Sequence, residues 1–143
     1  MAGEFILDAS VTVRWVLQDG SIADRTCADQ VLDSLEKSTA LVPSLWYTEI
    51  AHVLRCAEDD GKLGQSAIAE FLYFLGQMPI AMDKAAPAGT QLAVVSISRE
   101  FKLSGYDAQY LELAHRRNLP IATLDKDLRK AAKKAGVAIY LLQ

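Results

Sequence analysis

The sequence of 143 residues is poor in the residues that dominate several common types of catalytic site. It contains only two cysteines, Cys27 and Cys56, and two histidines, His52 and His115. Their spacing matches neither a zinc site nor a disulfide framework. The sequence also has no glycine-rich phosphate loop and no HExxH motif. These absences argue against zinc hydrolases, disulfide-stabilised secreted domains and P-loop nucleotide hydrolases.

Long apolar runs are absent as well. No run approaches the roughly 18 to 20 residues needed to span a bilayer, and no N-terminal secretory leader is visible. The composition, 51% hydrophobic and 23% charged residues, is that of an ordinary globular protein. We therefore expect one soluble cytoplasmic domain over residues 1–143, with a single core and no membrane association.

Positive charge is scarce overall but concentrated near the C-terminus. The formal net charge is −3, yet the segment 116–134 has seven basic residues against two acids, a net charge of +5. The rest of the chain therefore carries −8. Such a patch can attract a phosphate chain, although a solvated helix face rich in lysine is the simpler alternative. The basic residues are Arg116, Arg117, Lys126, Arg129, Lys130, Lys133 and Lys134.

Short apolar segments alternate with longer segments of helical periodicity. Strands are predicted at Phe5–Leu7, Ala40–Val42, Met78–Met82, Ile121–Leu124 and Val137–Leu142. Helices are predicted at about 9–17, 21–37, 44–60, 66–77, 88–101, 104–117 and 126–135. Strands that alternate with helices favour right-handed crossovers and a parallel sheet covered on both faces. The class is therefore α/β, with about five strands.

Three aspartates lie at points where a helix is predicted to begin. Asp8 follows the first predicted strand, Asp125 follows the fourth, and Asp107 lies three residues after Ser104. The carboxyl ends of parallel strands share one edge of a sheet, so Asp8 and Asp125 are expected to lie near each other. Each aspartate could instead serve as, or beside, a helix N-cap. The sequence leaves both roles open.

Glu49 is a fourth candidate, and capping does not explain it. It lies in the second turn of its predicted helix, too far from the helix start to cap it. Neither lysine nor arginine stands three or four positions away, so it has no ion-pair partner within the helix. Those neighbours are Leu45, Trp46, His52 and Val53. Glu49 needs a distant partner or water, unless its side chain simply reaches the surface.

The four acids together would suit a metal ion. Carboxylates that converge repel one another and become partly protonated, and a divalent cation removes that conflict. Oxygen ligands favour the hard ions Mg²⁺ or Mn²⁺ over zinc. Such a site can activate water and neutralise charge on a phosphodiester, so no catalytic serine or cysteine is required.

Four segments resemble the signature segments of PIN-domain nucleases. They are, in order, FILDASV, TEIAHVL, YDAQYLELA and LPIATLDKDL. Their order and the chain length resemble the VapC-type toxins of bacterial toxin–antitoxin pairs. The resemblance implies a three-layer fold with a five-stranded parallel sheet in the order 3-2-1-4-5. Asp8 and Asp125 would then flank the point where the winding reverses.

The resemblance also implies the chemistry. It implies an endoribonuclease that hydrolyses RNA with Mg²⁺ or Mn²⁺ held by Asp8, Glu49, Asp107 and Asp125. Asp127 matches an additional, outer acid, and Ser10 and Thr123 match supporting residues. A homodimer and an antitoxin that masks the site are also implied. We expect the antitoxin to dock on apolar side chains of Leu63–Leu75, although a buried helix or a homodimer contact would explain the same pattern.

Two other functions remain open at this point. A receiver-like signalling domain would also bind Mg²⁺ and would accept a phosphoryl group on Asp83, which follows the third predicted strand. Receivers usually carry adjacent acids after their first strand, whereas Ala9 follows Asp8. They also need a late lysine after a strand, and here Asp125 precedes Lys126. The other alternative is a non-catalytic binding module that kept the fold.

Overall fold

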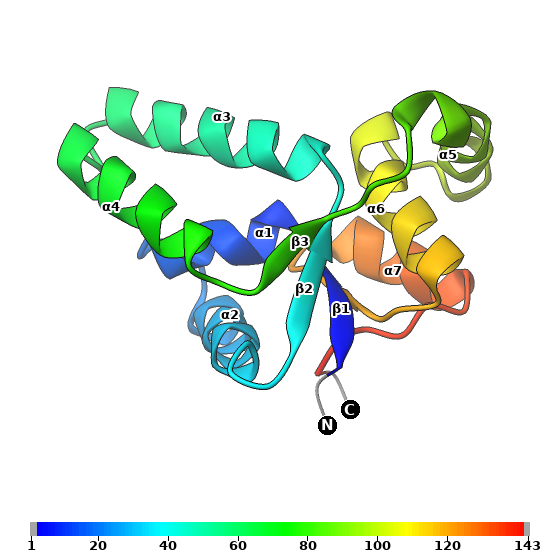
Figure 1. Cartoon of the computed structure of the whole chain (residues 1–143), viewed down its shortest axis with the longest axis horizontal. Coiled ribbons are helices and arrows are strands. Elements are labelled where there is room, and N and C mark those ends of the chain that lie inside the picture. The colour runs from blue at the N-terminus through cyan, green and yellow to red at the C-terminus, as the bar shows by residue number, and fades with distance from the viewer. Residues whose placement is uncertain (1–2, 142–143) are drawn as a thin grey trace.

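Four short parallel strands form the centre of the fold, which the computed structural model describes for residues 3–141 (Figure 1). The strands, in the order β3-β2-β1-β4, confirm that part of the expected topology. They are β1 (Glu4–Leu7), β2 (Thr39–Val42), β3 (Ile80–Met82) and β4 (Ile121–Ala122).

The expected fifth strand, Val137–Leu142, is wrong in its extent. Beside β4 the chain makes only one isolated parallel bridge, between Ile121 and Ile139. The ladder is short because β4 has only two residues and Ile121 alone pairs with this segment, donating to the carbonyl of Ala138 and accepting from the N–H of Tyr140. Leu141 then has a positive φ of 61°, which ends the extended run, and Leu142 lies outside the described residues.

Helices cover both faces of the sheet and confirm the α/β class. In Figure 1, α1 to α4 lie on one side of the sheet and α5 to α7 on the other. The helices are α1 (Ala9–Thr12), α2 (Ile22–Ser34), α3 (Leu45–Asp59), α4 (Gln65–Gly76), α5 (Pro87–Phe101), α6 (Gly105–Arg117) and α7 (Lys126–Lys134). A short 3-10 helix, Val13–Trp15, continues α1, where the sequence indicated one uninterrupted helix.

Several helix boundaries follow from identifiable residues. The side chains of Ser21 and Ser104 accept hydrogen bonds from the backbone N–H groups of Asp24 and Asp107, at 3.0 and 3.1 Å. These bonds satisfy donors in the first turns of α2 and α6. At the other end of α6, Asn118 takes the left-handed conformation, with φ of 51°, and stops the helix as predicted.

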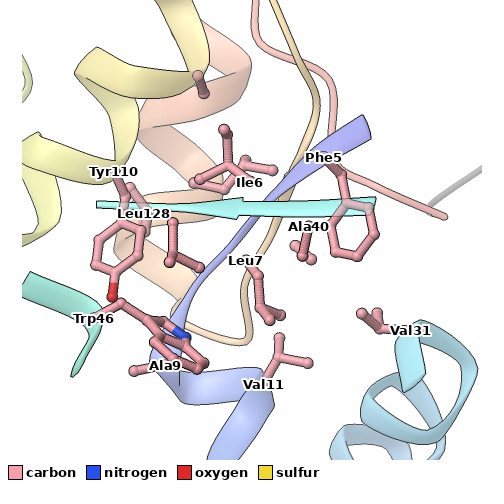
Figure 2. Packing of buried hydrophobic residues seen from close by; sticks show 14 of the residues in the cluster. Phe5, Ile6, Leu7, Ala9, Val11, Val31, Ala40, Trp46, Tyr110 and Leu128 are labelled. Carbon is pink, nitrogen blue, oxygen red and sulfur yellow. The ribbon is translucent and has the colours of Figure 1, made fainter. Parts of the chain in front are cut away.

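The central strand β1 is buried on both faces. Phe5, Ile6 and Leu7 are each 0% exposed, and side chains from both helical layers pack around them (Figure 2). Side chains on both faces of a parallel strand covered by helices are buried, so such a strand reads as an uninterrupted run of apolar residues. The first polar residue after it, Asp8, therefore emerges at the carboxyl edge of the sheet, beside the end of β4.

Candidate active site

Asp8 is fixed by two hydroxyl groups. Its Oδ2 accepts hydrogen bonds from Oγ of Ser10 at 2.6 Å and from Oγ1 of Thr123 at 2.7 Å. The residue is buried, and its side chain makes no capping bond to α1. The capping alternative is therefore wrong for Asp8, whose carboxylate is bound by Ser10 and Thr123 instead.

Asp125 does cap the helix that it precedes. Its Oδ1 accepts a hydrogen bond from the backbone N–H of Leu128 at 2.8 Å, at the start of α7. Its own N–H donates to Oγ1 of Thr123 at 3.1 Å. Thr123 therefore contacts both Asp8 and Asp125 and sets the spacing between them. Within the described residues, Oδ2 of Asp125 has no hydrogen-bond partner, so capping leaves one oxygen for another ligand.

Glu49 approaches the same edge of the sheet from α3. Its carboxylate is half-buried, and Oε1 accepts a hydrogen bond of 2.5 Å from the hydroxyl of Tyr110 in α6. The expectation that Glu49 needs a distant partner is confirmed by this contact. Sequence reasoning missed Tyr110, although its place three residues after Asp107 puts both residues on one side of α6.

The charges of these acids interact. The pKa of Asp8 is raised to about 6: burial raises it most, the hydrogen bonds from Ser10 and Thr123 oppose the rise, and the charges of Glu49 and Asp125 add to it. Burial also raises the pKa of Asp107 to about 6, together with the charges of Asp125, Asp8 and Asp127. The pKa of Glu49 rises because of burial and the charge of Asp107, against the bond from Tyr110. The five acids therefore form one electrostatic cluster.

No basic side chain neutralises this acidic cluster within residues 3–141. The ion pairs of that range involve none of Asp8, Glu49, Asp107, Asp125 and Asp127. An all-oxygen donor set with uncompensated negative charge suits a hard divalent cation. As the side chains stand, however, no three acids, histidines or cysteines of the described chain are close enough together to hold a metal ion. A cation that binds here must draw the carboxylates closer.

The basic residues of segment 116–134 divide into two groups. Arg116 and Arg117 end α6 and pair with acids outside the acidic cluster: Arg116 binds Glu112 and Asp83, and Arg117 lies 3.9 Å from Glu4, at the start of β1. The other group lies on or beside α7. Its exposed members are Lys126, Lys130, Lys133 and Lys134.

Arg129 is the half-buried member of the α7 group. Its Nε donates to the backbone oxygen of Thr123 at 2.6 Å, next to Asp125. The second side of the guanidinium lies 3.7 Å from Sγ of Cys27 in α2. Arg129 therefore ties α7 to the end of β4 at the acidic cluster, which is a position that spacing alone did not reveal.

Asp83 occupies a different environment from the acidic cluster. It follows the edge strand β3, whereas Asp8 follows β1, and β2 lies between these two strands. Arg116 donates to both of its carboxylate oxygens, at 2.7 and 3.3 Å. Arg116 also pairs with Glu112, a buried acid that sequence reasoning missed although Glu112 and Arg116 stand four residues apart in α6. An ion-paired Asp83 on an edge strand does not fit the phosphoacceptor of a receiver domain.

A cavity of about 820 Å³ lies between α5, α6 and the loop after β3. Its lining includes Ser44, Asp83, Tyr106, Gln109 and Glu112. Asp107, which follows the lining residue Tyr106 in the first turn of α6, is not among the lining residues. This cavity is therefore a neighbour of the acidic cluster and not part of it.

Comparison with known proteins decides the family. The PIN domain model matches residues 5–134, which is most of the chain and includes all five acids of the cluster. The chain belongs to the PIN domain family. No curated protein matches it at a significant level.

Solved structures support the fold of this PIN domain. The crystal structure of PAE2754 from Pyrobaculum aerophilum has a TM-score of 0.67 at 22% identity, covering 92% of this chain and 87% of the other. The crystal structure of FitAcB from Neisseria gonorrhoeae has a TM-score of 0.62 at 17% identity, covering 95% and 96%. In the part that the structure describes, no helix is long and apolar enough to cross a membrane.

Proposed function

We propose that this PIN domain is a metal-dependent endoribonuclease and the toxin of a toxin–antitoxin pair. The observation that carries the proposal is the acidic cluster of Asp8, Glu49, Asp107, Asp125 and Asp127. Three of its members have pKa values raised by burial and mutual repulsion, and none is ion-paired within residues 3–141. PIN domains are generally nucleases, and the match of this chain to the PIN domain model spans all five acids.

The cation proposed for the site is Mg²⁺ or Mn²⁺. Asp8, Glu49, Asp107 and Asp125 would hold it, with Asp127, exposed in the first turn of α7, as an outer acid. When bound, such an ion lowers the pKa of water and neutralises charge on a phosphodiester. It would also relieve the repulsion that raises the pKa values of Asp8 and Asp107.

The protein's own residues fix the acids for hydrolysis. Ser10 and Thr123 hold Asp8, and the first turn of α7 holds one oxygen of Asp125. In the reaction, water oxygen bonds to phosphorus in line with the leaving 3′ oxygen, the P–O3′ bond breaks, and the 3′ oxygen takes a proton. The products carry 5′-phosphate and 3′-hydroxyl ends, as the family resemblance implies.

RNA would reach the site along α7. Lys126, Lys130 and Lys133 are exposed at spacings of four and three residues, which places them along one side of the helix. α7 begins at Asp125, so this row of positive charge starts beside the acidic cluster. Phosphate contacts of this kind position an RNA strand without selecting its sequence.

An antitoxin would dock on α4. Phe71 and Leu75 are buried, whereas Leu72, Tyr73 and Phe74 are 48%, 72% and 38% exposed. The exposed side chains form an apolar surface of the kind that a partner helix covers. Leu72→Asp and Tyr73→Asp should fold and lose co-purification with the product of the neighbouring gene. Normal binding by both folded variants would contradict this docking surface.

The homodimer belongs to the same proposal. Its support is α5, which has no fully buried residue and exposes Leu92 and Val95, by 81% and 50%. Sedimentation of the wild type and of Leu92→Asp tests it. A monomeric wild type, or an unchanged mass for the variant, would contradict a dimer through α5.

Cleavage assays with matched variants test the nuclease activity. Asp8→Asn and Asp125→Asn should each reduce cleavage of single-stranded RNA by about a hundredfold or more, because several kcal/mol of transition-state stabilisation depends on the site. Asp83→Asn, which changes an acid outside the cluster, should keep most of the activity. Full cleavage in excess EDTA, or by both cluster variants, would contradict the proposal. A folded wild type that binds RNA without cutting it would favour a non-catalytic module.

A further inference from the structure

Tyr110 is a buried polar residue that the proposed chemistry has not yet used. Its side chain is 0% exposed, and its hydroxyl donates the 2.5 Å hydrogen bond to Oε1 of Glu49. Figure 2 shows the ring within the core, with the hydroxyl directed toward the side where Trp46 of α3 lies. The bond therefore crosses from one helical layer, α6, to the helix on the other side of the sheet that carries Glu49.

A second buried hydrogen bond fixes the start of α3. Nε1 of Trp46 donates to Oγ1 of Thr12 at 3.2 Å, which ties the first turn of α3 to α1. Trp46 is one turn before Glu49, so this bond sets the position of the helix backbone. It does not set the direction of the Glu49 side chain, which has three rotatable bonds. Tyr110 supplies the contact that does.

We propose that Tyr110 is a positioning residue that holds the Glu49 carboxylate in place at the acidic cluster. This inference rests on the proposed function. A long acidic side chain surrounded by like charges would otherwise turn away from them toward water. A donor on the rigid, buried ring of Tyr110 opposes that movement. Partners of this kind, which bind a metal ligand and not the metal, typically change metal affinity by about 10- to 100-fold when removed.

Packing alone does not explain a tyrosine at this position. Phenylalanine would fill the same core volume without a hydroxyl that needs a partner. The chain offers a control in Tyr140, whose ring stacks on Phe5 with centroids 3.9 Å apart and whose hydroxyl binds Oγ of Ser38 at 3.3 Å. Tyr140→Phe removes a hydroxyl of the same kind away from the acids.

Thermal melts in EDTA test the contact without metal. Tyr110→Phe should lower Tm by about 4 °C in the wild type, since it removes a hydrogen bond to a charged group. In the Glu49→Ala background the same substitution should lower Tm much less, because its acceptor is already gone. Equal shifts in both backgrounds would overturn the inference.

Mn²⁺ titration of the full chain tests the positioning role. Tyr110→Phe should raise the Kd for Mn²⁺ by about 10-fold or more, whereas Tyr140→Phe should leave it unchanged. If the melts show coupling but Tyr110→Phe binds Mn²⁺ as the wild type does, Tyr110 only stabilises the fold and the positioning role is wrong. A wild type that neither binds Mn²⁺ nor cleaves RNA would overturn the proposed function, and the melts in EDTA would still decide whether Tyr110 holds Glu49.

Discussion

Two aspartates follow parallel strands of the same sheet, and their surroundings move their pKa values in opposite directions. Asp83 follows β3, and the hydrogen bonds and charge of Arg116 lower its pKa. Asp8 follows β1, where burial and the charges of other acids raise its pKa to about 6. A carboxylate at the end of a strand is therefore weak evidence for a functional site. Asp8 differs from Asp83 because other acids lie around it and no basic side chain within residues 3–141 neutralises its charge.

The comparison extends to the neighbours of each aspartate. Arg116 joins Asp83 to the buried Glu112, so two acids share one cation in a network that supports the fold. At the other end of α6, Asp107 faces the acidic cluster, and its pKa is raised. At its C-terminal end, α6 therefore belongs to a network in which Arg116 neutralises the charge of the acids. At its N-terminal end, it belongs to the acidic cluster, whose negative charge no basic side chain of the described chain neutralises.

The largest expected effect is a loss of stability of the metal-free protein as pH rises. The pKa of Asp8 is higher in the folded state, about 6, than its usual value of 3.8, so the folded state binds this proton more tightly. Stability from this group is complete below about pH 4 and falls as pH rises to about 6, by on the order of 3 kcal/mol. Urea unfolding in EDTA between pH 4 and 7.5 measures this fall.

Asp8→Asn separates the cluster from other titrating groups. Asn keeps the shape but carries no charge, so the variant should unfold at higher urea than the wild type in EDTA near pH 7. Saturating Mn²⁺ should shrink or reverse that gap, because the cation binds only the folded site. Identical pH profiles for the two proteins in EDTA would mean that the acids do not destabilise the fold.

Arg116→Met should have the next largest effect, a loss of about 2 kcal/mol, since it leaves the buried Glu112 without its cation. Arg55→Met is a suitable control. Arg55 pairs with Glu58 and Asp59 on the exposed side of α3, and such surface pairs contribute about 0.5 kcal/mol or less. Similar unfolding free energies for the two variants would remove the distinction between the network of Arg116 and ordinary surface ion pairs.

Thr123→Val should have a smaller effect, about 1 kcal/mol near neutral pH. Thr123 is buried and donates to Asp8, and this hydrogen bond lowers the pKa of Asp8. Without it, the fall in stability with pH should extend to a higher pH. Unfolding profiles of the variant and the wild type in EDTA check the shift, and an unchanged midpoint would mean that Thr123 does not tune Asp8.

Much of the fold follows from local patterns in the sequence. Buried strands such as Phe5–Leu7 have unbroken apolar sequences, and serine caps such as Ser21 and Ser104 mark helix starts, so their positions were predictable. The last strand was overpredicted because an apolar run does not specify pairing. Its extent depends on the two-residue length of β4 and on the backbone at Leu141, which are set by tertiary geometry.

The acids of the candidate site were predictable by position, but their partners were not. The bond between Tyr110 and Glu49 joins helices far apart in the chain, and the clamp of Arg116 on Asp83 spans two layers of the fold. For the same reason the sequence grouped Arg116 with the α7 lysines, although in the fold Arg116 pairs with Asp83 and Glu112. Periodicity shows which residues share a helix face, whereas contacts between elements depend on how the elements pack.

The smallest expected effect concerns the lysines of α7. Each phosphate contact releases counterions, so Lys130→Ala and Lys133→Ala should each reduce the salt slope of RNA binding by about 0.7 for single strands. Over a fourfold change in salt, one such contact changes affinity by only about 2.6-fold. Fluorescence anisotropy with a labelled RNA across a salt series measures both quantities.

Arg116→Met provides the informative comparison in that salt series. Arg116 carries the same charge as the lysines, but two acids already bind it, so it has no counterions to release and its removal should leave the slope unchanged. Lys37→Ala, an exposed lysine between α2 and β2, should also leave the slope unchanged. If Arg116→Met reduces the slope as much as Lys130→Ala does, RNA also contacts the ion-pair network of Arg116, Asp83 and Glu112. The two ends of α6 would then not differ in their role toward RNA.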